Sequence, residues 1–200
     1  MTRKMLLTGW LALVFSTIGW LFWHNEWKYS LPTPVPANYR AVAAGTVIDL
    51  ANEVNQDQDK PVFLHFFNPD CPCSRFNIRQ FKSLVKQYSD RINFSVVVLA
   101  KDSSYTVSDI QDKFGLTLPV LFDKSIATKC GVYSTPQAVL INTDSKLYYR
   151  GNYNKSRYCT DRNSNYAQMA IDSLLHNNVN PLFAQAALKS YGCTLPSCSK

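Results

Sequence analysis

Residues 61–75 read PVFLHFFNPDCPCSR and are the most informative segment for the architecture of the chain. The first seven of these residues form a short apolar run, as is typical of a buried central strand. Beyond Pro72 the apolar side chains recur at the spacing of one helical face, at Ile78, Phe81, Val85 and Tyr88. The stretch therefore predicts a buried strand followed by an amphipathic helix, with two cysteines at the junction.

Further strands and helices alternate on both sides of this junction. Strands are expected at residues 93–100, 119–122, 137–142 and 146–150. Helices are expected at residues 46–54, 107–114, 124–130, 165–176 and 182–190. This alternation predicts an α/β fold in which helices cover both faces of a central sheet.

The cysteine pair at the junction is the strongest indication of chemistry. With Pro72 as the first helical residue, Cys71 is the N-cap, where backbone N–H groups and the helix dipole stabilise a thiolate. Such a position lowers a cysteine pKa below its usual value of about 8.5 and makes the sulfur a nucleophile. We therefore predict thiol-disulfide exchange, with Cys71 and Cys73 as the catalytic residues.

The spacing of the pair is C-x-C, and it leaves other roles open. Residues two apart on a helix point to different sides, so a Cys71–Cys73 disulfide would be strained and easily reduced. Two buried structural cysteines are one alternative. A Cu(I) site is another, because soft thiolates select that ion. No histidine pair has metal-ligand spacing, so we expect no other metal and no cofactor.

The segment around the cysteines resembles the active site of the thioredoxin superfamily, and a second hallmark follows at residues 131–140, GVYSTPQAVL. The resemblance implies a thioredoxin-like fold with a central mixed β-sheet. It also implies that Pro136 is a cis proline beside the cysteines and that the backbone of Thr135 binds substrate. Residues 118–123, LPVLFD, resemble the redoxin branch, which includes peroxiredoxins and membrane-tethered thiol reductases.

The chain departs from this family in the residues around its cysteines. Ser74 stands where the resolving cysteine of the family is found, so the partner of Cys71 stays open. A peroxiredoxin has Thr or Ser three residues before its cysteine, whereas Asn68 and Asp70 hold those places for Cys71 and Cys73. A thiol peroxidase is therefore the second-ranked function.

The other four cysteines are candidates for resolving or structural roles: Cys130, Cys159, Cys193 and Cys198. Exported chains use cysteines mainly for disulfides. We expect Cys193 and Cys198 to staple the tail, with a relay role for one of them as the alternative. Cys130 is expected to be a buried thiol, and Cys159 lies in a basic loop that could cover the active site.

The N-terminus predicts a membrane anchor. Residues 5–23 carry no charge and follow Arg3 and Lys4. As a helix they would extend about 28 Å, which is the thickness of a bilayer core. The positive charges favour a cytoplasmic N-terminus. We expect a single-pass inner-membrane protein with its globular part on the periplasmic side; a cleaved signal peptide is the alternative.

Three parts are predicted from this pattern: an anchor and its flank at residues 1–28, a proline-rich linker at 29–45, and a thioredoxin-like domain with a cysteine-containing extension at 46–200. Beyond residue 28 there are 18 basic and 13 acidic side chains, a net charge of +5. This excess is too diffuse to indicate nucleic acid. The expected partners are the membrane, protein substrates that carry thiols or disulfides, and a redox partner of unknown identity.

Overall fold

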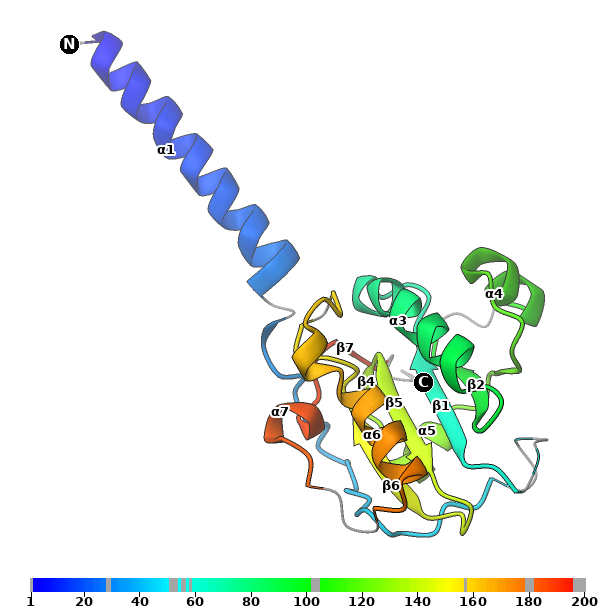
Figure 1. Cartoon of the computed structure of the whole chain (residues 1–200). Helices are drawn as coiled ribbons and strands as arrows, with labels where there is room; N and C mark the ends of the chain where they lie inside the picture. The colour runs from blue at the N-terminus through cyan, green and yellow to red at the C-terminus, as the bar shows by residue number, and fades with distance from the viewer. Residues whose placement is uncertain are drawn as a thin grey trace. The chain divides into compact units, whose positions relative to one another are not determined.

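The computed structural model describes residues 2–27, 30–50, 54, 57, 59–101, 105–156, 158–178 and 182–195. The chain divides into two compact units, Met1–Leu31 and Pro32–Lys200. Figure 1 shows the helix of the first unit and the mixed α/β architecture of the second.

The first unit is one long helix. Helix α1, Thr2–Phe22, continues into the π-helical turn η1, Trp23–Trp27. Together they are long and apolar enough to cross a membrane, with a mean hydropathy of 1.8 and no residue of that window buried by other parts of the chain. Indole rings gather at the C-terminal end, where Trp23 stacks on Trp27 at 6.3 Å between centroids.

The second unit is built on a five-stranded mixed sheet in the order β3-β2-β1-β5-β6. Its strands are β1 Val62–Phe67, β2 Asn93–Val98, β3 Val120–Leu121, β5 Gln137–Ile141 and β6 Leu147–Gly151. Strands β1, β2 and β3 are parallel to one another, whereas β5 runs antiparallel to both β1 and β6. The predicted central mixed sheet is confirmed.

Helices cover both faces of this sheet, as predicted (Figure 1). They are α3 Pro72–Tyr88, α4 Val107–Phe114, α5 Ser125–Cys130, α6 Tyr166–Leu175 and the short α7 Gln185–Leu188. The central strand β1 alternates between the two cores, since Phe63 and Phe67 pack with α3 and α6 while Leu64 and Phe66 pack with α5. All four of these side chains are fully buried.

Helix α4 has the bounds that its sequence predicts, because both ends carry a cap. The Thr106 hydroxyl accepts from the backbone N–H of Asp109, and the Asp109 carboxylate accepts from the N–H of Thr106. Gly115 ends the helix at φ 59°, a left-handed conformation that glycine adopts without strain.

The helix expected at residues 46–54 is wrong over residues 46–50, none of which is helical; residues 51–53 lie outside the described chain. Val47 forms a β-bridge with Lys146, and the N–H of Ile48 donates to the carbonyl of Ser145 at 2.8 Å. The β-branched run from Thr46 to Ile48 favours extended backbone, and the neighbouring hairpin supplies the hydrogen-bond partners.

Part of the predicted linker belongs to the compact unit. The hydroxyl of Tyr39 donates to the carbonyl of Gly131 at 2.9 Å, and Arg150 donates to the carbonyl of Val42 at 2.8 Å. At the start of the unit, the N–H of Thr33 donates to the carbonyl of Ser190 at 2.9 Å. Residues in 32–45 are therefore packed against the domain through specific bonds.

Candidate active site

Cys71 occupies the helix N-cap, as predicted. Its backbone is extended, at φ −87° and ψ 122°, and Pro72 is the first residue of α3. The Cys71 N–H donates to the carbonyl of Asn68 at 3.1 Å, and the Cys71 carbonyl accepts from Arg75 at 3.2 Å. No side chain caps the helix, so its first N–H groups and the dipole act on the sulfur.

The peptide bond between Thr135 and Pro136 is cis, which confirms the expectation for Pro136. It lies beside the cysteine, because the Sγ of Cys71 is 3.8 Å from the carbonyl oxygen of Thr135. Both residues are buried, Cys71 at 2% exposure and Thr135 at 0%. In its thiol form, Cys71 can donate a weak hydrogen bond to this carbonyl.

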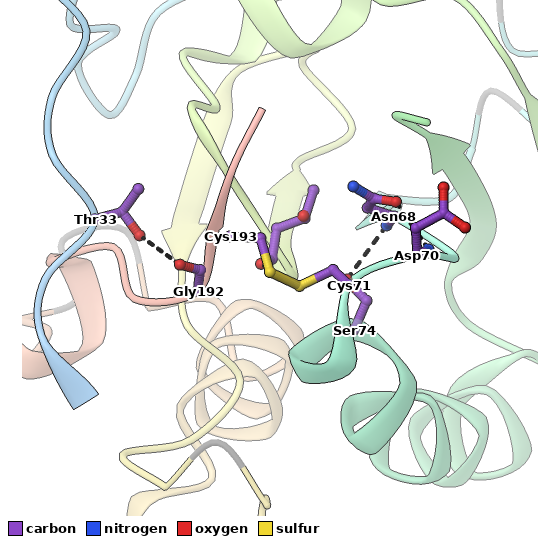
Figure 2. Close-up of a disulfide and its surroundings, with 8 residues drawn as sticks. Thr33, Asn68, Asp70, Cys71, Ser74, Gly192 and Cys193 are labelled. Atoms are coloured by element: carbon purple, nitrogen blue, oxygen red, sulfur yellow. Dashed lines mark hydrogen bonds between the residues drawn. A yellow bond between two sulfur atoms is a disulfide. The ribbon is translucent and has the colours of Figure 1, made fainter. Parts of the chain in front are cut away.

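The covalent partner of Cys71 is Cys193 (Figure 2). The two Cα atoms are 6.3 Å apart across a sequence separation of 122 residues. The expected Cys193–Cys198 staple is therefore not what the structure shows for Cys193, and Cys198 lies outside the described residues. The pairing places Cys193 where the alternative role, a resolving or relay thiol, would require it.

A two-stranded sheet brings Cys193 to this place. Strand β4, Ser134–Thr135, pairs antiparallel with strand β7, Cys193–Thr194, so that Thr135 stands opposite Cys193. The tail thus pairs with the residue that precedes the cis proline. No local sequence pattern marks β7, since a two-residue strand shows no periodicity.

Cys73 completes a cluster of three sulfurs. It lies in the first turn of α3, carries a thiol and is 2% exposed. The Sγ atoms of Cys71, Cys73 and Cys193 all lie within 4.8 Å of one another. The structure thus brings the predicted pair together and adds Cys193 to it. With all three reduced, the cluster is also the set of described residues that could hold a soft metal ion.

Ser74, at the family's position for a resolving cysteine, supports the turn before the helix. Its buried hydroxyl accepts from the N–H of Asn68 at 3.2 Å. The Asn68 side chain in turn accepts from the N–H of Asp70 at 2.9 Å. The exposed Asp70 carboxylate accepts from the hydroxyl of Tyr105 at 2.6 Å, and in Figure 2 it points away from the disulfide.

The other two described cysteines lie outside the sulfur cluster. Cys130 ends α5 and is fully buried in the core on that face of the sheet, as expected for a buried thiol. Cys159 is half-buried and accepts from the side-chain amide of Asn77 at 3.2 Å. Burial raises the pKa of the Cys159 thiol to about 11, although the Asn77 bond opposes that shift. Cys159 therefore packs beside α3 as a thiol.

His65 is a core residue, as its place in the predicted strand suggests. Its Nδ1 lies 2.8 Å from the Tyr153 hydroxyl, and its ring stacks on Phe81 at 4.3 Å. Burial lowers the pKa of His65 to about 3, so the ring is neutral near neutral pH. It belongs to the packing of β1 and not to the sulfur cluster.

Comparison with known proteins supports the redox interpretation at the level of the fold. The chain is 26% identical over 97 residues to the thiol-disulfide oxidoreductase ResA of Halalkalibacterium halodurans, a match that covers 48% of this chain and 55% of the relative. The chain thus spans about half the length of that relative.

Solved structures match over more of the chain. A hypothetical protein from Sinorhizobium meliloti 1021 has a TM-score of 0.64 at 15% identity, covering 81% of this chain and 98% of its own. An uncharacterized conserved protein from Geobacillus kaustophilus also has a TM-score of 0.64, at 17% identity, over 84% and 100%. A thioredoxin-like protein in its oxidised form has a TM-score of 0.50 at 13% identity, over 65% and 97%. The expected thioredoxin-like fold is confirmed.

One family model covers most of the second unit. It matches residues 40–195 and so includes the cysteine pair, the cis proline and strand β7. The chain therefore belongs to the family described as "Domain of unknown function (DUF6436)".

Proposed function

We propose that the protein is a membrane-tethered thiol-disulfide oxidoreductase that acts on exported proteins through Cys71. The position of the Cys71 sulfur supports this proposal. The sulfur of Cys71 lies at the N-terminus of α3, is bonded to a second cysteine, and is 3.8 Å from the Thr135 carbonyl before the cis proline. A substrate cysteine would occupy the place that the sulfur of Cys193 takes in this structure.

The proposed chemistry follows from these positions. Reduction of the disulfide leaves thiols at Cys71 and Cys193. The Cys71 thiolate, stabilised by the helix N-terminus, attacks one sulfur of a substrate disulfide and releases the other as a thiolate. A second thiol of the protein then attacks Cys71, forms a new disulfide with it and releases the substrate in reduced form. With donor and acceptor exchanged, the same steps oxidise a substrate dithiol.

Cys73 is the proposed second catalytic residue of the pair. Its sulfur lies within 4.8 Å of both sulfurs of the disulfide, so a small shift brings it within reach of either one. A Cys73 thiolate that attacks the sulfur of Cys71 would form a Cys71–Cys73 disulfide and release Cys193 as a thiolate.

The proposed location rests on the N-terminal helix. Residues 2–27 are suited to crossing a bilayer, and Arg3 and Lys4 favour a cytoplasmic N-terminus. The second unit then lies on the periplasmic side, where disulfides persist. A membrane-bound or periplasmic dithiol protein would recharge it as its redox partner.

The test uses the full chain in detergent micelles, equilibrated with glutathione over a series of redox ratios, with disulfides mapped by mass spectrometry. We expect reversible oxidation of Cys71, and reduction of a peptide disulfide at a rate that Cys71→Ser lowers by about a hundredfold or more. Cys130→Ser, a buried thiol outside the cluster, is the matched control and should keep the wild-type rate. A Cys71→Ser variant with undiminished exchange would refute the proposal.

The three sulfurs within 4.8 Å favour a Cu(I) carrier as the second candidate, ahead of the thiol peroxidase that the sequence ranked second. Stoichiometric Cu(I) retention by the reduced chain, lost in Cys71→Ser and Cys73→Ser and not accompanied by exchange activity, would support it. The lower-ranked peroxidase is measured in the same preparation by the consumption of hydrogen peroxide with a dithiol reductant.

A further inference from the structure

The tail segment, residues 190–195, lies along the strand that precedes the cis proline. Thr135 stands opposite Cys193 and Ser134 opposite Thr194 in the antiparallel ladder between β4 and β7. Cys193 therefore meets the active site in two ways at once, through backbone pairing at Thr135 and through its sulfur at Cys71. A bound polypeptide with a cysteine would make the same two contacts.

The fit of the tail to β4 requires glycine before the cysteine. Gly192 has φ 138°, a conformation that other residues rarely adopt. A Cβ atom at Gly192 would overlap the carbonyl oxygen of Thr135 and lie 3.0 Å from its carbonyl carbon. The backbone of the tail thus approaches β4 closely, which only glycine allows at this position.

Contacts from other parts of the domain hold the tail in this place. The Thr33 hydroxyl donates to the carbonyl of Gly192 at 3.3 Å (Figure 2), and Pro32 forms a β-bridge with Tyr191. The side-chain amide of Gln137 donates to the hydroxyl of Ser190, which is 2% exposed. The tail is therefore bound on both sides by noncovalent contacts that do not depend on the disulfide.

We propose that the tail segment is a built-in substrate strand: it occupies the polypeptide-binding edge of β4, and Cys193 is the catalytic thiol that resolves the mixed disulfide when the tail returns. The proposal rests on the proposed function and names its substrate class. That class is an extended polypeptide in which a glycine precedes the cysteine.

The proposed exchange begins with reduction of the disulfide. A reduced dithiol partner becomes oxidised as the Cys71–Cys193 disulfide becomes two thiols. The tail leaves β4, the substrate pairs there, and the Cys71 thiolate attacks its disulfide and releases one substrate thiolate. The returning Cys193 thiolate attacks the sulfur of Cys71, restores the Cys71–Cys193 disulfide and releases the second substrate thiolate. Substrate binding and tail binding exclude each other at β4.

The first experiment measures how well the tail protects Cys71 without any exchange reaction. The full chain in micelles is reduced, and alkylation of Cys71 by N-ethylmaleimide is timed by mass spectrometry. Gly192→Ala keeps all six cysteines but should not fit against Thr135, so we expect alkylation to be about tenfold faster. Gly45→Ala is the matched control, because Gly45 also has positive φ, at 84°, but a Cβ there has nothing within 4 Å.

A second variant tests the same contact without relying on the folding of Gly192→Ala. Thr33→Val removes the hydroxyl bond to Gly192 and should accelerate alkylation of Cys71 in the same direction, by a smaller factor. Far-ultraviolet circular dichroism verifies the fold of each variant. Unchanged alkylation of Cys71 in both Gly192→Ala and Thr33→Val would overturn the proposal.

The second experiment tests the substrate class with peptides activated as mixed disulfides with thionitrobenzoate. The peptide SYGCTL copies residues 190–195, and SYACTL differs from it only by the added methyl group. In Gly192→Ala we expect SYGCTL to react with Cys71 about tenfold faster than SYACTL. Equal rates for the two peptides would overturn the glycine requirement. If neither peptide reacts with any variant, the oxidoreductase proposal itself fails, whereas the alkylation result still decides whether the tail covers Cys71.

Discussion

The buried His65 should make the second unit sensitive to acid, and His65→Asn should remove much of that sensitivity. The side chain is fully buried in β1, stacks on Phe81 and shares a hydrogen bond between Nδ1 and the Tyr153 hydroxyl. Asparagine has an amide oxygen near the position of Nδ1, so it can keep the Tyr153 partner but cannot titrate in this range.

The size of this acid sensitivity follows from the pKa of His65 in the unfolded chain and in the folded protein. Burial lowers the pKa of His65 from 6.5 to about 3. As the pH falls through 6.5 the unfolded chain takes up a proton, whereas the folded protein does not until about pH 3. The contribution of His65 is therefore fully present above pH 6.5 and is lost as the pH falls. Between about pH 7.5 and pH 4.5 it should lower the free energy of unfolding by about 2.6 kcal/mol.

The assay is urea unfolding at those two pH values, followed by the near-ultraviolet circular dichroism of tyrosine, since the tryptophans all lie in residues 10–27. Carboxylates also titrate in this range, so the test compares the pH-dependent loss of unfolding free energy in His65→Asn with the loss in the wild type. We expect the pH-dependent loss in His65→Asn to be smaller than in the wild type by about 2.6 kcal/mol. An equal loss in the wild type and in His65→Asn would refute a lowered pKa for His65.

Three further predictions concern the disulfide, a helix cap and a buried thiol. Reducing the Cys71–Cys193 bond, which spans 122 residues, should lower the free energy of unfolding by about 3–5 kcal/mol, measured as a shift of the urea midpoint. Thr106→Ala removes the cap of α4 and should cost about 1 kcal/mol, leaving the rate of peptide disulfide reduction unchanged. Because burial raises the pKa of Cys159 to about 11, iodoacetamide should spare it in the native protein at about pH 8. Asn77→Ala should raise that pKa further, seen as a later rise in alkylation rate with pH.

The parts of the site that local sequence determines could be predicted. An apolar strand, a proline at the first helical position and a helix that ends before a glycine each depend on residues within one or two turns. They predicted β1, the N-cap position of Cys71 and the bounds of α4. The cis conformation of Pro136 came from the family resemblance, because an isolated Thr-Pro bond favours trans.

The covalent partner of Cys71 could not be predicted, for a physical reason. The pairing of Cys193 with Thr135 joins two strands of two residues each, and six cysteines allow many pairings. The helix expected at residues 46–50 was wrong for the same reason. There a long-range bridge from Val47 to Lys146 outweighs the local helical spacing. In both places the structure depends on partners far along the chain.

The separation of the two bonded cysteines also sets an order of events during biosynthesis. Cys193 is made 122 residues after Cys71, a delay of roughly 6–24 s at about 5–20 residues per second. Throughout that interval the ribosome has delivered Cys71 and Cys73 but not the tail. The Cys71–Cys193 disulfide therefore cannot form until all of the intervening residues have been made, and during that time the tail segment cannot cover Cys71.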